Sequence, residues 1–200
     1  LEATHNPIFR APFQPVLAGR ATFLPFPATD GSDADRVLAA AEEAFASGRI
    51  GAVLFEPIQG RGGFRVPPPG FLAALCAAAA RAGVATIADE IYTGCGRTGA
   101  FLASTAAGVV PDVVCLGKAL GGGVPLSVCM MRPRVADAVR CAGPEAVHTS
   151  TFLGHPLACA AGLAVLSELE RLDFAAVAAR IEAKVRARAE AWRLRFPIVA

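Results

Sequence analysis

The sequence predicts an α/β fold with a mostly parallel sheet, and three observations lead to this prediction. Strand-like and helix-like runs alternate along the 200-residue chain. The strand-like runs are short and nearly all apolar, as expected for strands that are buried on both faces. Charged side chains follow several of these runs. We therefore expect a three-layer protein in which helices cover both faces of the sheet.

The first predicted elements are a short strand and a helix. Residues 21–26 have a strand-like composition and are followed by a turn-rich stretch. Ser32 or Asp33 can cap a helix that runs to about Ser47, because their side-chain oxygens accept hydrogen bonds from free backbone N–H groups. Gly48 ends this helix, since glycine readily adopts the left-handed conformation that closes helices.

The next elements form a strand–helix–strand unit. Residues 50–55 are β-branched and apolar, and they place Glu56 at the end of a strand. A glycine- and proline-rich loop then leads to an alanine-rich helix at 70–82. The strand at 84–88 comes next and is itself followed by Asp89. Two carboxylates thus stand at strand ends, where ligands bind in open α/β sheets.

The remaining elements repeat this pattern. A glycine-rich loop at 94–99 precedes a strand at 113–116, and Lys118 follows that strand within two residues. Residues 126–131 resemble one more strand. Three further helices are predicted, at residues 133–140, 156–172 and 174–195. The last of them is long, charged and amphipathic.

Composition and charge argue against several classes of function. A net charge of +2 without a run of lysine or arginine gives no indication of nucleic-acid or acidic-membrane binding. The longest nearly apolar stretch, 71–80, is too short to span a bilayer. The six cysteines are scattered, without a C-x-x-C pair or a metal-like cluster with histidine. We therefore expect no metal and favour reduced thiols in the cytoplasm over a disulfide framework.

Asp89 and Lys118 together predict a specific chemistry. A lysine amine can form a Schiff base with the aldehyde of pyridoxal phosphate, and a carboxylate can hold a proton on the pyridine nitrogen so that the ring accepts electrons. Both residues come after predicted strands, and ligands gather at that edge of a sheet. The alternatives are a surface lysine after a strand and an aspartate that caps a helix.

Several ordered motifs resemble those of the class III aminotransferases, which are fold type I pyridoxal phosphate enzymes that include ornithine, acetylornithine and 4-aminobutyrate aminotransferases. The resemblance covers nearly the whole chain. The matching segments are Phe55-Glu56-Pro57-Ile58-Gln59-Gly60, Ala88-Asp89-Glu90-Ile91-Tyr92-Thr93-Gly94, Gly96-Arg97-Thr98-Gly99, Asp112, Leu116 to Gly123 and His148-Thr149-Ser150-Thr151-Phe152. The resemblance implies a transaminase that moves an amino group between an amine or amino acid and a 2-oxo acid.

The resemblance also implies roles for single residues. Lys118 matches the Schiff-base lysine, which also moves the proton between substrate and cofactor, and Asp89 matches the partner of the pyridine nitrogen. Thr151 matches the threonine that binds the cofactor phosphate of the neighbouring subunit in a homodimer, and Ser150 beside it is counted as cofactor-binding. The alternative for Thr151 is an ordinary cap of the helix that follows.

Glu56 and Tyr92 match positions close to the cofactor. Glu56 could instead pair with a nearby arginine, for which the candidates are Arg61, Arg65 and Arg97. Tyr92 stands where glutamine or a small apolar residue is usual beside the cofactor 3′-oxygen, and its phenol either donates a hydrogen bond there or stacks. Arg61 replaces an acidic residue of many family members, which leaves the amino donor and acceptor open.

Both ends of the chain resemble cut points in a longer protein. The chain starts at Leu1 without a signal-peptide pattern, and its last residues begin a strand-like run. We assign 1–172 to part of the pyridoxal phosphate-binding large domain, and 173–200 to a linker helix and the truncated start of a small domain. The family's upstream glycine-rich phosphate loop and its C-terminal substrate-binding arginine fall outside this chain, so weak cofactor binding by the fragment is expected.

Three other functions fit parts of the pattern. An aminomutase of the glutamate-1-semialdehyde type uses the same lysine and aspartate. A degenerate paralogue with a structural or regulatory role is a second alternative, although it would not need to retain both residues. A nucleotide-binding α/β domain could use Gly121-Gly122-Gly123 for phosphate, but the chain lacks the G-x-G-x-x-G and P-loop patterns.

Overall fold

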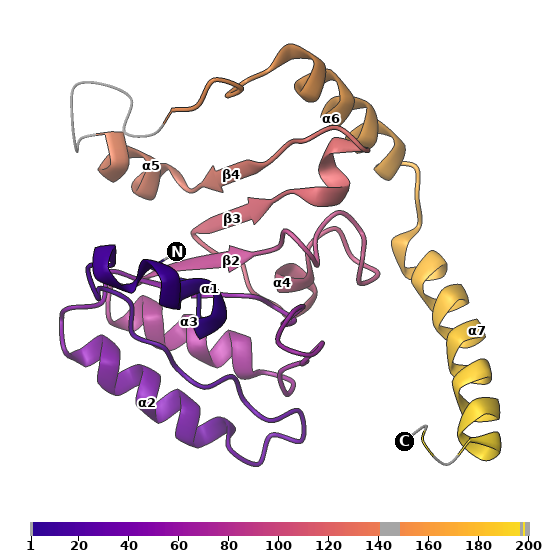
Figure 1. Cartoon of the computed structure of the whole chain (residues 1–200), viewed down its shortest axis with the longest axis horizontal. Helices are drawn as coiled ribbons and strands as arrows, with labels where there is room; N and C mark the ends of the chain where they lie inside the picture. Colours follow the sequence, from indigo (N-terminus) through magenta and orange to yellow (C-terminus); the bar gives the residue numbers. More distant parts are fainter. Residues whose placement is uncertain (1, 141–148, 197, 199–200) are drawn as a thin grey trace.

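The computed structural model of the chain describes residues 2–140, 149–196 and 198. At its centre lies a four-stranded sheet with the strand order β1-β2-β3-β4 (Figure 1). The strands are β1 (Ala52–Phe55), β2 (Ala85–Asp89), β3 (Val113–Leu116) and β4 (Val128–Met131). The first three strands run parallel, whereas β4 is antiparallel to β3. The prediction of an α/β protein with a mostly parallel sheet is therefore confirmed.

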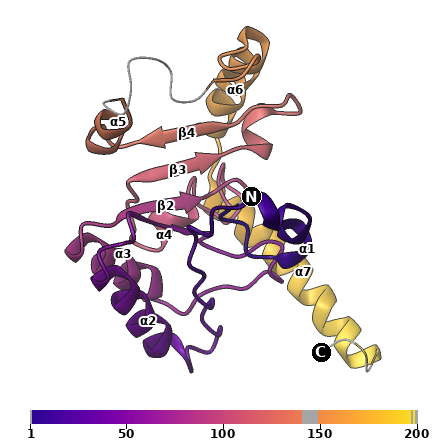
Figure 2. The same ribbon diagram turned by 60° about the vertical axis from the view of Figure 1, so that its left-hand side comes forward.

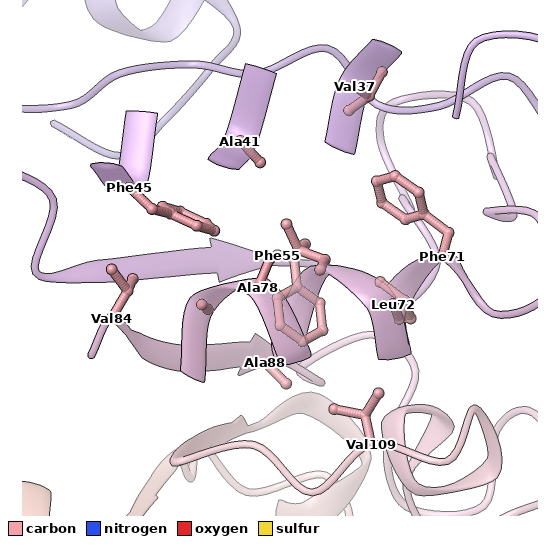
Figure 3. Close-up of a cluster of buried hydrophobic side chains, with 12 residues drawn as sticks. Val37, Ala41, Phe45, Phe55, Phe71, Leu72, Ala78, Val84, Ala88 and Val109 are labelled. Atoms are coloured by element: carbon pink, nitrogen blue, oxygen red, sulfur yellow. The ribbon is translucent and has the colours of Figure 1, made fainter. Parts of the chain in front are cut away.

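Two helices pack on one face of this sheet and form the main core with it. They are α2 (Ala34–Ala46) and α3 (Phe71–Arg81), and both lie within the ranges that the sequence predicts. Figure 3 shows Phe45 of α2 and Leu72 of α3 in the same cluster as Phe55 of β1. Burying a side chain of this kind stabilises the fold by about 1.5–3 kcal/mol.

The other face of the sheet is less well covered. Neighbouring strand residues point to opposite faces, so Phe55 and its partner Ala88 share the helix-covered face, and Leu54 and Met131 lie on the other. Leu54 is 48% exposed and Met131 is 41% exposed. The expected second helical layer is not found among the described residues. The connections β1–α3–β2 and β2–α4–β3 join parallel strands and proceed across the sheet in the same direction. Because such connections are right-handed, both helices lie on the same face of the sheet.

Shorter and more distant helices complete the described structure. They are α1 (Pro7–Arg10), the 3-10 helix η1 (Ala11–Val16), α4 (Ala103–Ala106), the 3-10 helix η2 (Lys118–Gly121), α5 (Pro133–Arg140), α6 (Pro156–Leu169) and α7 (Phe174–Arg195). α6 packs against η2, whereas α7 extends away from the sheet (Figures 1 and 2). None of the helices in the described ranges is both long and apolar enough to cross a membrane.

Four predicted elements differ from the structure by two residues or more. Residues 21–26 are not a strand, because they pair with no other strand. Pro25 and Pro27 lack the N–H that sheet pairing requires, which explains this difference. β1 and β4 each begin two residues later than predicted, and α6 ends at Leu169 rather than at 172. The division of the chain at 172/173 stays a prediction, and His148 lies outside the described residues.

Asp112 connects the starts of β2 and β3 with the beginning of α5. This residue is 7% exposed, and its carboxylate accepts hydrogen bonds from the Thr86 backbone N (2.9 Å) and the Thr86 hydroxyl (3.0 Å). Its other oxygen accepts a hydrogen bond from Arg134 Nη2 at 2.7 Å. Burial raises the pKa of Asp112, but the hydrogen bonds from Arg134 and Thr86 outweigh burial and leave this pKa below its usual value of 3.8.

Replacing Asp112 with alanine is therefore expected to destabilise the fold by about 2–3 kcal/mol, because the buried Thr86 groups lose their acceptor. A lowered pKa in the folded state stabilises the protein above pH 3.8, and this contribution is lost as the pH falls through the folded value. Urea unfolding between pH 3 and 7 measures both effects. Asp137→Ala, at a carboxylate that forms an exposed ion pair with Arg140, is the control. Equal losses in both variants would contradict the assigned role.

Candidate active site

The candidate residues come together because three parallel strands end at the same edge of the sheet. Glu56 follows β1, Asp89 is the last residue of β2, and Lys118 follows β3 after Gly117. The pairing of Asp89 with Cys115 brings the ends of β2 and β3 side by side. The structure thus places these three candidate residues at the edge where open α/β sheets bind ligands.

The backbone of Lys118 has an unusual conformation. Its φ angle is +45°, in the left-handed region that residues other than glycine rarely adopt. Such a conformation costs about 1–3 kcal/mol and persists where the surroundings impose it, often at functional sites. Here the Leu120 N–H bonds to the Gly117 carbonyl at 3.1 Å, and the buried Leu120 side chain anchors the turn.

The Lys118 side chain is accessible at this turn. It is exposed, and its Nζ lies 5.4 Å from the centre of the Tyr92 ring. Within the described residues it forms no ion pair, either with Asp89 or with Glu56. An exposed amine without an acidic partner can react with a carbonyl compound that binds at this edge.

Asp89 is half-buried and has one oxygen that can receive a ligand. Its Oδ1 accepts a hydrogen bond from the Ile91 backbone N at 3.1 Å. Its Oδ2 has no hydrogen-bond donor in the part of the chain that the structure describes. This arrangement fits a protonated ring nitrogen, which would supply the missing donor and a positive charge. Together with the accessible Lys118 amine, it fits the cofactor that the sequence predicts.

Glu56 is bound to its own loop and not to an arginine. Its Oε2 accepts a hydrogen bond from the Gly60 backbone N at 2.9 Å. Arg61 lies over the Phe9 ring instead, and Arg65 donates to a backbone carbonyl. The alternative of an ion pair between Glu56 and one of the three candidate arginines is therefore wrong within the described residues. Through this hydrogen bond, Glu56 holds the loop whose Gly60 lies against the Tyr92 ring.

Tyr92 lies between the loop after β1 and the turn after β3. Its side chain is 44% exposed, and its ring centre is 6.0 Å from that of Phe64. Gly60 permits this position, because a Cβ at Gly60 would meet Tyr92 Cγ at 3.3 Å. The Tyr92 ring therefore lies against Gly60 of the loop after β1, and the Lys118 amine is close to it. Stacking and hydrogen bonding to a ligand are both open to it.

Ser150 and Thr151 are not brought to this edge. Both are exposed and lie in the segment before α6, beyond β4 in Figures 1 and 2. Neither hydroxyl forms a hydrogen bond with the edge residues in the described structure. The helix-cap alternative for Thr151 is wrong, because His155 is the N-cap of α6 and its Nδ1 accepts from the Ala158 N. Their phosphate-binding role stays a prediction that requires a second subunit.

Glu90 is a residue for which the sequence predicted no role. It is 1% exposed, and its carboxylate accepts hydrogen bonds from the Ser104 N at 2.7 Å and the Ala103 N at 3.2 Å, at the start of α4. The Thr93 hydroxyl also donates to it. Glu90 therefore fixes the loop that directly follows Asp89. The acidic doublet at 89–90 is visible in the sequence, but the return of α4 to it is not.

The chain matches known proteins along nearly its whole length. The family model described as "Aminotransferase class-III" matches residues 1–194. Acetylornithine aminotransferase of Mycolicibacterium smegmatis is 40% identical over 88% of this chain and 41% of that protein. Putrescine aminotransferase of Pectobacterium atrosepticum is 41% identical over 84% of this chain and 35% of that protein.

Solved structures give the same result. An amine transaminase from an uncultivated Pseudomonas species, in a pyridoxal phosphate-bound form, superposes with a TM-score of 0.82 at 32% identity. The match covers 98% of this chain and 48% of that one. Ornithine aminotransferase from Toxoplasma gondii gives a TM-score of 0.67 at 39% identity, over 78% of this chain and 35% of that one. The chain spans less than half the length of each of these relatives.

Proposed function

The chain belongs to the class III aminotransferase family, and on that premise we propose that its protein transfers an amino group between an amine or amino acid and a 2-oxo acid with pyridoxal 5′-phosphate. The observation that carries the proposal is the turn at Lys118, which holds an accessible amine in a strained backbone conformation beside Tyr92. The relatives named above are aminotransferases. No observation favours the aminomutase or the non-catalytic alternative.

In the proposed mechanism, Lys118 and Asp89 carry the chemistry. Pyridoxal phosphate, when bound, supplies a ring that takes up the electrons left when a proton leaves the substrate Cα. Lys118 Nζ would hold the cofactor covalently, and its amine would move the proton between the substrate Cα and the cofactor C4′. Asp89 would accept a hydrogen bond from the ring nitrogen and keep its proton in place.

The remaining candidates bind and orient. Tyr92 is proposed to contact the ring of the cofactor, since it already lies beside the Lys118 amine. Glu56 is proposed to hold the loop that supports Tyr92 through its bond to Gly60. Ser150 and Thr151 are proposed to bind the cofactor phosphate of the neighbouring subunit. Their exposed position away from the edge supports this proposal, because it leaves them accessible to a second chain.

A homodimer and a cytoplasmic location are part of the proposal. A two-fold dimer would give each site the hydroxyls of the other chain and two equivalent sites per dimer. The described cysteines are free thiols, as is usual in a reducing compartment, which supports the location.

Borohydride trapping tests the proposed attachment site. The chain has two lysines, Lys118 and Lys184, so that Lys184 is an internal control. After incubation with pyridoxal phosphate and reduction, we expect the pyridoxyl group on Lys118, which blocks tryptic cleavage there and yields one peptide that spans 98–134. A Lys184→Ala variant should be labelled equally well. Label on Lys184 alone or equal labelling of both lysines would contradict the proposal.

A further inference from the structure

Two cysteines lie directly opposite each other on neighbouring strands. Cys115 of β3 pairs in register with Cys129 of β4, and these strands are antiparallel. Opposite residues of an antiparallel pair have Cα atoms about 4.5–5.5 Å apart and point to the same face. A disulfide requires Cα atoms about 4.4–6.8 Å apart. The backbone can therefore accept a bond between these two residues without moving.

The pair is accessible and lies next to the candidate active site. Cys129 is exposed and Cys115 is half-buried. On the side away from β4, Cys115 pairs with Asp89 of β2, so that Asp89, Cys115 and Cys129 lie in one row across the sheet. Among the described cysteines, no other two are opposite each other in the sheet.

We propose that Cys115 and Cys129 form a redox-active dithiol that a small-molecule disulfide, such as glutathione disulfide, oxidises to a cross-strand disulfide beside Asp89. The pair is thus a modification site at the edge of the proposed active site. Its formation depends on the geometry of β3 and β4 alone, and not on cofactor binding.

The exposed thiol starts the exchange. Burial raises the pKa of Cys115 to about 11, and the nearby Cys129 and Asp89 add to this effect, so Cys115 stays protonated at neutral pH. The Cys129 thiolate attacks one sulfur of glutathione disulfide, whose S–S bond breaks and releases a glutathione thiolate. Cys115 then loses its proton to that thiolate and attacks the Cys129 sulfur, which releases the second glutathione. Two protein thiols are oxidised, and one glutathione disulfide is reduced to two glutathiones.

The bond would close a loop that contains the reactive turn. Residues 116–128 lie between the two cysteines and include Lys118 and the three glycines that follow it. A cross-link restricts the unfolded chain and so raises the thermal unfolding temperature of the oxidised protein. Reduction with dithiothreitol should return this temperature to its starting value.

Non-reducing peptide mapping tests the proposal. The purified protein is incubated with glutathione disulfide, its remaining thiols are blocked with N-ethylmaleimide, and it is digested with trypsin. Cleavage at Lys118 separates the cysteines into peptides 98–118 and 119–134, since trypsin does not cut before Pro133. We expect these two peptides to be linked in more than half of the protein, and to separate after reduction.

Matched variants identify the order of events. Cys115→Ser should stop at a glutathione adduct on Cys129, and Cys129→Ser should form no linked peptide. Cys159→Ser, at an exposed cysteine of α6, should form the linked peptide like the unchanged protein. A stable glutathione adduct on Cys129 of the unchanged protein, or linkage of Cys115 to a different cysteine, would overturn the proposal. Peptide mapping does not depend on cofactor binding, so its result tests the dithiol proposal independently of the transaminase assignment.

Discussion

Replacing Lys118 with alanine is expected to lower kcat for transamination by about 10⁴-fold or more, because a positioned proton-transfer group contributes about 10²–10⁴-fold and the covalent anchor is lost as well. The fold should persist. The Lys118 side chain is exposed and forms no ion pair in the described structure, so its removal deletes little packing. Steady-state kinetics and thermal unfolding of the purified, cofactor-loaded protein measure the two effects.

Two further variants separate chemistry from charge. Lys118→Arg retains the positive charge near Tyr92, but a guanidinium stays protonated and cannot act as a base. It should therefore be as inactive as the alanine variant. Lys184→Ala removes an exposed lysine of α7 and should retain full activity. Activity of Lys118→Arg within tenfold of the unchanged protein would show that Lys118 acts only through its charge, contrary to the mechanism proposed here.

The position of the candidate site could be predicted because its signals are local. An apolar run followed by Glu56, Asp89 or Lys118 is visible in the sequence, and strands of a parallel sheet end at a common edge. The structure adds what local patterns do not contain, namely the strain at Lys118 and the contact of its amine with Tyr92. The resemblance pointed to these positions, and the strand ends explain why they meet.

Features that depend on distant partners were not predictable. The pairing of Cys115 with Cys129 depends on strand register, which the scattered cysteine spacing does not reveal. Ion pairing of Glu56 with an arginine was a reasonable alternative, but the nearby Gly60 N–H satisfies this carboxylate first. The roles of Ser150 and Thr151 depend on a second subunit, which one sequence cannot place.

The site also depends on a buried carboxylate that does not touch it. Replacing Glu90 with alanine is expected to destabilise the fold by about 3 kcal/mol or more, because three buried donors lose their acceptor and each unpaired donor costs about 1–3 kcal/mol. The donors are the Ala103 and Ser104 backbone N–H groups and the Thr93 hydroxyl. This loss is a large part of the 5–15 kcal/mol that is usual for a folded domain.

Glu90→Gln and Glu43→Ala make this prediction specific. The glutamine retains one acceptor oxygen and directs its NH₂ group toward a buried donor, so its loss should lie between zero and that of alanine. Glu43 is exposed on α2 and has no hydrogen bond among the described contacts, so its removal should change the free energy of unfolding by less than about 0.5 kcal/mol. Chemical unfolding of Glu90→Ala, Glu90→Gln and Glu43→Ala measures the order of their free energies of unfolding.

If Glu90→Ala were as stable as Glu43→Ala, the loop after Asp89 would be held by other contacts. One such contact is the hydrogen bond from the Gly94 N–H to the Glu90 carbonyl at 2.8 Å. The alanine variant retains this backbone bond and loses only the carboxylate. A large loss of stability would therefore show that the Glu90 side chain holds the loop after Asp89.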